Sequence, residues 1–418
     1  MEILHILNTL LGLLFFLCFA YQILYIFLPF LLRDHPHKPT FPHRYAILIA
    51  ARNEERVIPY LLQTLREQDY PAERFTVFVI ADNCTDRTAE AARAGGAVVF
   101  ERYDTVHVGK GYALDALLTQ IHTLYGKDAF DAYMVFDADN LLAPDFLSAM
   151  NRTFSDGYRI ITSYRNSKNY GDNWISAGYA LWFMRESCFL NHPRMLLGTS
   201  CAVAGTGFCV AREVLEATNG WKFFLLSEDT EFTIDAILRG EQIAYCREAM
   251  LYDEQPTKFK QSWHQRMRWA KGYLQVFGKY ATRLLRGIFA RGGFACFDMC
   301  MCTMPPIVLG ALGILLHIAT AAAALMKGIE PSAILMQSAI AFAEGYFGLL
   351  LLGAVTTAAE WKRIETTTAK KIGYLFTFPL FMMTYLPIAV TAIFRRVEWK
   401  PIEHTAARSL EEMKLNRD

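Results

Sequence analysis

Four long apolar stretches constrain what this chain can fold into. The first, Leu10–Leu32, holds no charged residue and is long enough to cross a bilayer as a helix. Three similar stretches lie towards the other end, at Pro305–Met326, Ser332–Ala359 and Ile372–Phe394. Between the first stretch and the others lie about 250 residues, 35–286, of ordinary globular composition. The sequence therefore predicts a globular domain bracketed by membrane-spanning helices.

Charged residues beside the first stretch predict the orientation of the chain. Arg33, Lys38 and Arg44 follow it, and it has no small-residue cleavage site, so we expect it to remain as an anchor. Because positive flanks stay in the cytosol, we expect a multi-pass protein of the cell membrane whose globular domain is cytosolic.

The last apolar stretch raises a conflict of charges. Basic residues flank it on both sides, in 361–371 and from Arg395 onwards, yet a single crossing would put one of these flanks outside. Pro379 and Pro387 lie within the stretch and allow a bent or re-entrant segment. We therefore expect an even number of crossings after the globular domain and a cytosolic C-terminus.

Composition excludes some classes of protein. The formal net charge is +1 and no strongly basic domain stands out, which argues against nucleic acid as a partner. The nine cysteines contain no CxxC pair, and Cys296, Cys300 and Cys302 have no nearby histidine to complete a zinc site. We expect reduced thiols rather than disulfides.

The globular part alternates strand and helix patterns. Four short apolar, β-prone runs are expected to be buried strands: Tyr45–Ala51, Phe75–Ala81, Ala97–Phe100 and Tyr133–Phe136. Helical patterns separate them, and polar residues follow their carboxyl ends. This order is typical of an α/β nucleotide-binding fold, in which ligands lie outside the carboxyl ends of the strands.

Two carboxylates, Asp137 and Asp139, follow the last of these strands. A hard divalent cation such as Mg²⁺ or Mn²⁺ takes oxygen ligands and shares them with substrate phosphates, so the pair suits a metal site. The alternative is a pair of solvated aspartates in a turn that ends the strand.

Two helix starts carry further candidate residues. Lys110 begins a helix outside any P-loop spacing, and is either a solvated lysine or a positive charge near a diphosphate. Glu228 and Asp229 precede another helix. Acids are stabilised there by capping and the helix dipole alone; the alternative is that one of them is a general base.

A third candidate is one face of the helix expected from about Phe259 to Gly278. Gln265, Arg268 and Trp269 share this face because they are three and four residues apart. An amide, a guanidinium and an indole form a poor core stripe, since Arg and Gln are costly to bury without partners. They form a good recognition surface for a hydroxyl, a phosphate and a sugar ring.

Taken in chain order, these residues resemble a known motif series. Asp82, Asp137-Ala-Asp139, Glu228-Asp229 and Gln265-x-x-Arg268-Trp269 resemble the D, DxD, (E)D and QxxRW motifs of membrane-bound family-2 glycosyltransferases. That group includes cellulose, chitin, hyaluronan and poly-N-acetylglucosamine synthases. The resemblance runs from about Tyr45 to Tyr280. It implies an α/β fold of the GT-A type, a nucleotide-sugar-binding domain with a mainly parallel sheet, flanked by transmembrane α-helices.

The resemblance also implies roles for individual residues. Asp139 would hold Mg²⁺ or Mn²⁺ on the donor diphosphate, and Asp229, with Glu228 beside it, would deprotonate the acceptor hydroxyl. Six residues would bind the nucleotide of a UDP-sugar donor: Ala51, Asn53, Glu54, Asp82, Lys110 and Asp137. Three would bind the pyrophosphate and the acceptor: Gln265, Arg268 and Trp269. The tail residues 396–400 also fit the group.

The expected domain organisation follows from the spans and the motifs. It comprises an N-terminal anchor (1–34), a cytosolic GT-A domain (35–282), an interfacial helix or linker (283–304), a C-terminal membrane region (305–396) and a tail (397–418). The basic, partly amphipathic run Lys279–Arg291 suggests the interfacial helix; the alternative is a solvated linker.

The function that this resemblance favours is an inverting hexosyltransferase. A UDP-hexose or N-acetylhexosamine would be added to a growing β-linked polysaccharide, processively and coupled to export. The alternative acceptor is a membrane lipid, as in glycolipid synthases, and a remote alternative is an inactive export partner. Ala81 before Asp82, Ser227 before Glu228 and the lack of a cyclic-dinucleotide module weaken a cellulose assignment and leave the sugar open.

Overall fold

The computed structural model describes residues 2–414 except 35, 291, 304, 400, 403 and 405. Within these residues, eight strands form one sheet in the order β3-β2-β1-β4-β7-β6-β8-β5. The strands are β1 (Tyr45–Ala51), β2 (Phe75–Asp82), β3 (Val98–Arg102), β4 (Ala132–Asp137), β5 (Leu141–Leu142), β6 (Ile160–Ser167), β7 (Phe208–Ala211) and β8 (Ile243–Asp253).

Helices cover the sheet and extend beyond it. In chain order they are α1 (Glu2–Leu31), α2 (Ile58–Arg66), α3 (Thr88–Ala94), α4 (Lys110–Tyr125), α5 (Phe146–Ser155), α6 (Trp174–Glu186), α7 (His192–Leu196), α8 (Arg212–Ala217), α9 (Glu228–Leu238), α10 (Phe259–Ile288), α11 (Gly293–Thr303), α12 (Pro305–Met326), α13 (Pro331–Ala359), α14 (Thr368–Met383), α15 (Tyr385–Phe394) and α16 (Leu410–Lys414).

The sheet is mixed, with a parallel half that positions the polar residues. Strands β3, β2, β1 and β4 run parallel, and β6 runs parallel to β8. Strand β7 lies antiparallel between β4 and β6, and β5 is antiparallel to β8. The predicted α/β class is confirmed. Because β1, β2 and β4 are parallel neighbours, the residues at their carboxyl ends meet at one edge of the sheet.

The apolar run of β1 is explained by burial on both faces of the sheet. Ala46 and Leu48 pack in one core with α4 and α6, whereas Ile47 and Ile49 pack in another with α2 and α5. Successive strand residues point to opposite faces, so a strand covered on both sides is apolar throughout.

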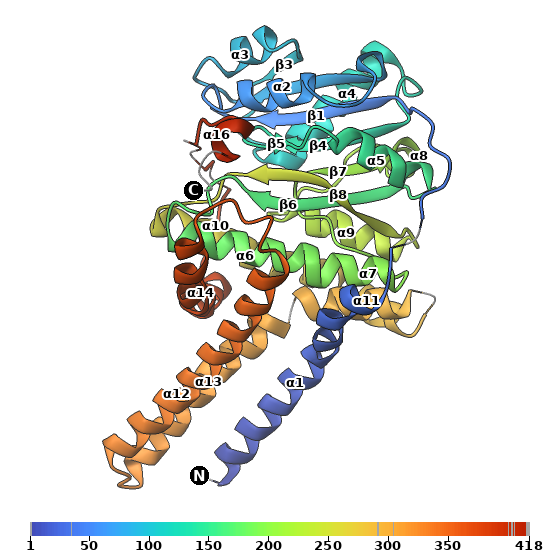
Figure 1. Ribbon diagram of the computed structural model, residues 1–418. Coiled ribbons are helices and arrows are strands. Elements are labelled where there is room, and N and C mark those ends of the chain that lie inside the picture. Colours follow the sequence, from blue (N-terminus) through green and yellow to red (C-terminus); the bar gives the residue numbers. More distant parts are fainter. Residues whose placement is uncertain are drawn as a thin grey trace.

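Long apolar helices extend from the domain on the side away from β3 and α3 (Figure 1). Helices α1, α12 and α13 project together away from the sheet, beyond a layer that includes α6, α7 and α11 (Figure 1). Four helical segments are long and apolar enough to cross a membrane: Ile6–Leu31, Pro305–Met326, Pro331–Ala359 and Thr368–Phe394. They agree with the four stretches expected from the sequence.

The fourth segment is two helices rather than one. α14 packs on α6 and α13, and α15 packs on α10 and α12, with a break at Thr384 between them. The buried Arg266 of α10 donates to the carbonyl of Phe381 (3.1 Å) and to the hydroxyl of Thr384 (2.7 Å) at this break. A bent or re-entrant segment was expected here, and Arg266 donates to the backbone carbonyl of Phe381 at the bend.

One boundary differs from the sequence expectation. Helix α10 continues past Gly278 to Ile288, so most of the basic run after Lys279 extends this helix instead of forming an interfacial helix of its own. The run stays helical because its apolar residues, such as Tyr280 and Leu284, keep the helical spacing and pack against α9 and α11. The expected end of that run, Arg291, lies outside the described residues.

Candidate active site

A cavity of about 690 Å³ lies between the carboxyl edge of the sheet and the membrane helices. Of the residues singled out from the sequence, eleven line it: Ala51, Glu54, Asp82, Lys110, Asp137, Asp139, Glu228, Asp229, Gln265, Arg268 and Trp269. Asn53 does not. Its backbone has a φ of +59°, and its side-chain oxygen accepts a hydrogen bond from the backbone N–H of Thr85 (2.8 Å), which shapes the loop beside the cavity.

At one end of the cavity, Asp82 is held by an arginine that the sequence analysis missed. Asp82 is 4% exposed, and Arg102 donates to its Oδ1 at 2.5 Å. Burial raises the pKa of Asp82, and Arg102 offsets part of this shift. The strand that carries Arg102 was expected to end at Phe100. A basic residue two positions beyond an apolar run is weak evidence for a functional role. Only the pairing of β3 with β2 shows that the partner of Arg102 is Asp82.

The C-terminal tail reaches the same end of the cavity. Nδ1 of His404 lies 2.9 Å from Oε1 of Glu54, and the indole of Trp399 lies 5.2 Å from the Arg52 guanidinium. Burial alone would lower the pKa of His404, but Asp139 and Glu54 raise it to about 10. The tail was noted in the sequence only for residues 396–400, of which Lys400 lies outside the described residues.

Asp137, at the end of β4, and Asp139 both line the cavity, and each carboxylate accepts a hydrogen bond. Glu254 donates its backbone N–H to Oδ2 of Asp139 (2.7 Å), and the Lys110 ammonium pairs with Asp137 and with the carbonyl of Gly205 (2.8 Å). The described residues contain no cluster of three or more candidate metal ligands. A Mg²⁺ or Mn²⁺ ion fits such a pair if the donor diphosphate completes its coordination.

Two consecutive acids occupy the start of α9. Asp229 Oδ1 accepts the backbone N–H of Thr230 (2.7 Å), which fixes the carboxylate at the helix end. A side chain at Gly205, where φ is +80°, would place its Cβ 3.1 Å from Asp229, so a glycine is needed for this close approach. Burial raises the pKa of Asp229, and burial together with Asp229 raises the pKa of Glu228 to about 7.

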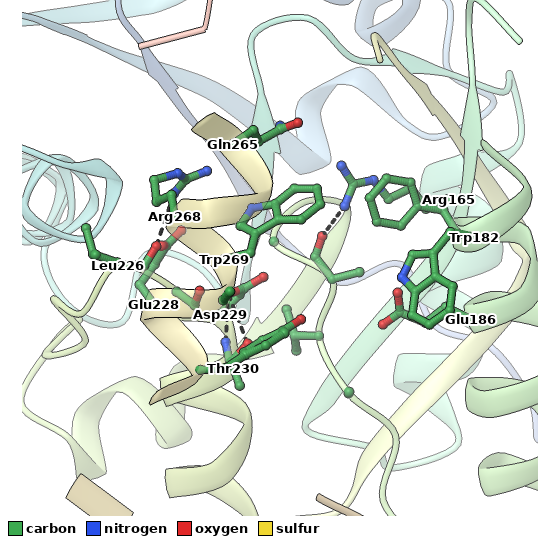
Figure 2. A pocket seen from close by; sticks show the side chains of 18 of the residues that line it. Arg165, Trp182, Glu186, Leu226, Glu228, Asp229, Thr230, Gln265, Arg268 and Trp269 are labelled. Atoms are coloured by element: carbon green, nitrogen blue, oxygen red, sulfur yellow. Dashed lines mark hydrogen bonds between the residues drawn. The ribbon is translucent and has the colours of Figure 1, made fainter. Parts of the chain in front are cut away.

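Helix α10 places its polar face against these acids (Figure 2). Arg268 donates to the carbonyl of Leu226 (3.1 Å), and no carboxylate among the described residues pairs with it. Trp269 contacts the rings of Tyr179 and Phe183 edge to face and still lines the cavity. The buried Oε1 of Gln265 has no hydrogen-bond partner among the described residues. The amide oxygen of Gln265 suits a hydroxyl that donates to it, and the Arg268 guanidinium, which has no carboxylate partner among the described residues, suits an anionic group such as a phosphate.

The cavity continues past these residues into the membrane helices. Its far end is lined by apolar side chains of α1, α12 and α15, among them Phe15, Phe19, Ile307 and Leu386. The end of α6 contributes Trp182, Arg185 and Glu186 between the two ends. Sequence reasoning missed these three residues. The sequence feature that could have identified them is the pair of adjacent charged residues, Arg185 and Glu186, after an apolar helical run.

Comparisons with known proteins identify the family. The profile described as "Glycosyltransferase like family 2" matches residues 42–272. The chain is 26% identical over 270 residues to a probable glycosyltransferase, YdaM, of Bacillus subtilis (58% of each chain), and 29% identical over 248 residues to a beta-monoglucosyldiacylglycerol synthase of Synechocystis (58% of this chain, 50% of the relative). The chain thus spans about half the length of the curated relatives it matches.

A solved structure supports the fold alone. The mannosyltransferase PcManGT from Pyrobaculum calidifontis, in complex with GDP-Man and Mn²⁺, aligns with a TM-score of 0.60 and 20% identity, over 85% of this chain and 98% of that one. The predicted GT-A-type α/β fold is therefore confirmed. The narrower group of polysaccharide synthases is not specifically matched, because the relatives include a glycolipid synthase. On the family match, which covers more than half of the chain, the protein belongs to the glycosyltransferase-like family 2.

Proposed function

We propose that this protein transfers a hexose from a UDP-sugar to a hydroxyl group of a membrane lipid. The observation that carries the proposal is that one cavity joins the acidic residues at the sheet edge to apolar side chains of the membrane helices. A nucleotide sugar would occupy the polar end and a lipid chain the apolar end. The resemblance to a beta-monoglucosyldiacylglycerol synthase supports the lipid acceptor and makes diacylglycerol the first lipid to test.

The membrane helices support a lipid over a polymer. A polysaccharide crossing the bilayer needs a channel with polar walls, because its hydroxyl groups are costly to place in hydrocarbon. In the most apolar part of each span, the buried share within the described structure is 6% in α1, 22% in α12, 11% in α13 and 33% in α14–α15. Because most of each span is exposed, these helices offer little surface with which to enclose such a channel. The polysaccharide synthase that the sequence favoured is accordingly the second candidate.

The charges in the cavity support transfer by direct displacement. Asp229 would accept the proton of the acceptor hydroxyl as that oxygen attacks the anomeric carbon. Arg268 and Lys110 would lie beside the departing diphosphate, where their charges stabilise the negative charge that develops. A divalent ion held by Asp139 and Asp137 would add Lewis-acid stabilisation when bound. One displacement with no covalent intermediate inverts the configuration and converts an α-linked donor to a β-linked product.

We further propose that the catalytic domain and the C-terminus share the cytosolic side. The hydrogen bond between His404 and Glu54 requires the tail and the domain to lie on the same side of the membrane. Two crossings, by α12 and α13, meet this requirement if α14 and α15 stay at the surface, where they pack on α6 and α10. Arg33, Lys38 and Arg44 after α1 favour the cytosol for that side.

The test is a direct assay of product and acceptor. The protein, purified in nanodiscs with diacylglycerol and Mn²⁺ or Mg²⁺, would receive UDP-glucose, UDP-galactose, UDP-N-acetylglucosamine or UDP-glucuronate, with UDP release and product mass recorded. We expect a lipid carrying one sugar. A high-mass polymer from the wild type would overturn the lipid proposal.

Two variants control this assay. Asp229→Asn should remove transfer while the protein still folds and binds donor. Asp128→Asn changes a carboxylate that is 90% exposed and away from the cavity, and should keep full transfer. Equal activity of Asp229→Asn and the wild type would contradict the role of Asp229. If the wild type transfers sugar to diacylglycerol from none of the four donors, the proposal also fails, and the inactive export partner becomes the better interpretation.

A further inference from the structure

The end of α6 lies between the catalytic acids and the apolar end of the cavity. In Figure 2, Trp182 and Glu186 lie at the right of the view, and Asp229 lies left of centre beside Trp269; all four residues line the cavity. Arg185 precedes Glu186 and lines the same cavity, and Gln22 of α1 lies beside it. An acceptor lipid with its hydroxyl at Asp229 and its chains among α1 and α12 would have its headgroup at this position.

Arg185 is an incompletely paired guanidinium. Its Nη2 donates to Oε1 of Gln22 (2.8 Å), and its plane lies 4.9 Å from the Trp182 ring. Its Nε is buried and has no hydrogen-bond partner among the described residues, and none of their carboxylates forms an ion pair with it. Burial lowers its pKa. A buried donor without a partner is costly, so a ligand that offers an acceptor oxygen would be favoured here.

The other arginines of this region are already neutralised. Arg194 makes two hydrogen bonds to Asp298, at 2.7 and 2.9 Å, and Arg165 pairs with Asp253 through two nitrogens. Both carboxylates are almost fully buried. Arg194 and Arg165 are therefore paired, whereas Arg185, like Arg268 beside Asp229, has no ion pair among the described residues.

Glu186 is the complementary group. It lines the cavity, and within the described residues its carboxyl group has no side-chain hydrogen bond or ion pair. Burial raises its pKa, and the positive charges of Arg165 and Arg194 offset part of the shift. Arg185 and Glu186 are adjacent in sequence and line the same cavity, so an ionised Glu186 offsets the charge of Arg185. Arg185 offset in this way offers a phosphate group no excess of positive charge.

We propose that Arg185 and Glu186 form a headgroup subsite that selects an uncharged lipid bearing a hydroxyl and an ester or amide carbonyl. Arg185 donates to the carbonyl oxygen, and Glu186 accepts from a hydroxyl. An anionic head, such as that of a polyprenyl phosphate, would lie beside Glu186, whose charge offsets that of Arg185, and is disfavoured. This inference rests on the proposed lipid transfer and specifies its acceptor class.

The first experiment is a competition between acceptors. Wild-type protein in nanodiscs receives one UDP-sugar with equal amounts of dioleoylglycerol, phosphatidylglycerol and a polyprenyl phosphate, and the products are separated by mass. We expect kcat/KM for the neutral lipid to exceed that for either anionic lipid by about tenfold or more. Equal or better use of polyprenyl phosphate would uphold lipid transfer and overturn the neutral-head subsite. A polymer, or no glycolipid, would refute lipid transfer itself.

Two variants then test the residues. Arg185→Met should raise KM for dioleoylglycerol about tenfold and leave KM for the UDP-sugar unchanged. Glu186→Gln should increase the use of phosphatidylglycerol relative to dioleoylglycerol by about tenfold, a gain that damage to the fold would not produce. Arg286→Met, on the exposed side of α10, is the matched control and should change neither ratio. An unchanged acceptor preference in both cavity variants would overturn the assignment of these two residues.

Discussion

The paired acids at the start of α9 make a quantitative prediction about stability. The folded protein raises the pKa of Glu228 to about 7, against an ordinary value of 4.5, first because the carboxyl is buried and then because Asp229 lies beside it. Between these two values the folded state keeps a proton that the unfolded chain releases. Stability therefore falls as the pH rises from about 4.5 to 7.

Glu228→Gln removes this ionisation and mimics the protonated carboxyl. The difference between the two pKa values corresponds to at most about 3 kcal/mol, so at pH 8 the variant should unfold about 5 °C above the wild type. At pH 5, where Glu228 in the folded wild type is protonated, the two proteins should unfold at nearly the same temperature. Tryptophan fluorescence during heating in detergent measures both.

The difference between the unfolding temperatures of Glu228→Gln and the wild type, measured at pH 5 and at pH 8, tests whether the buried charge is responsible. Glu73→Gln, an exposed acid in the loop before β2, serves as a control and should show no pH-dependent gain. If Glu228→Gln gains nothing at pH 8, the folded protein solvates or pairs this carboxylate, and the argument from burial is wrong. An equal gain at pH 5 and pH 8 would assign the effect to packing instead of charge.

Three further predictions concern catalysis and anchoring. Asp229→Asn should lower kcat by about a hundredfold or more with donor affinity retained, measured by UDP release and by titration with UDP, because a base is lost while the site stays intact. Chelation with EDTA should abolish transfer and Mn²⁺ should restore it, with Asp139→Asn needing more metal for half-maximal activity; full activity in EDTA would refute the metal site. Arg194→Met should destabilise the protein by about 3 to 5 kcal/mol, since it removes the ion pair of the fully buried Asp298 and leaves it to neutral donors such as the hydroxyls of Tyr21 and Tyr25, and adding Asp298→Asn should recover part of the loss in thermal unfolding.

Much of the fold could be predicted from local patterns. The buried run of β1 and the acids that follow β4 are features of a few neighbouring residues, and their strands are where the pattern placed them. Spacing on a helix brought Gln265, Arg268 and Trp269 to one face, and all three line the cavity. Such features are set by the period of the helix or strand and need no knowledge of the rest of the chain.

The residues that were missed depend on long-range contacts. His404 reaches Glu54 across 350 positions of sequence, and no local pattern relates the two. Arg185 and Glu186 end an apolar helix, where charges usually meet solvent. Only the packing of α1 and α11 around that helix end turns them into the wall of a cavity. The apparent end of α10 at Gly278 was misplaced because a glycine is tolerated inside a helix that tertiary contacts stabilise.

Helix α10 shows how one short sequence serves both chemistry and anchoring. Arg266 and Arg268 are two residues apart, so they point to different sides of the helix. Arg268 faces the cavity, whereas Arg266 is fully buried and holds the break between α14 and α15, next to Met267 and Ala270, which pack against α12 and α15. The position of Arg268 relative to Asp229 therefore depends on how α15 packs against α10. The membrane helices thus form a wall of the site and also fix the helix that carries its charged residues.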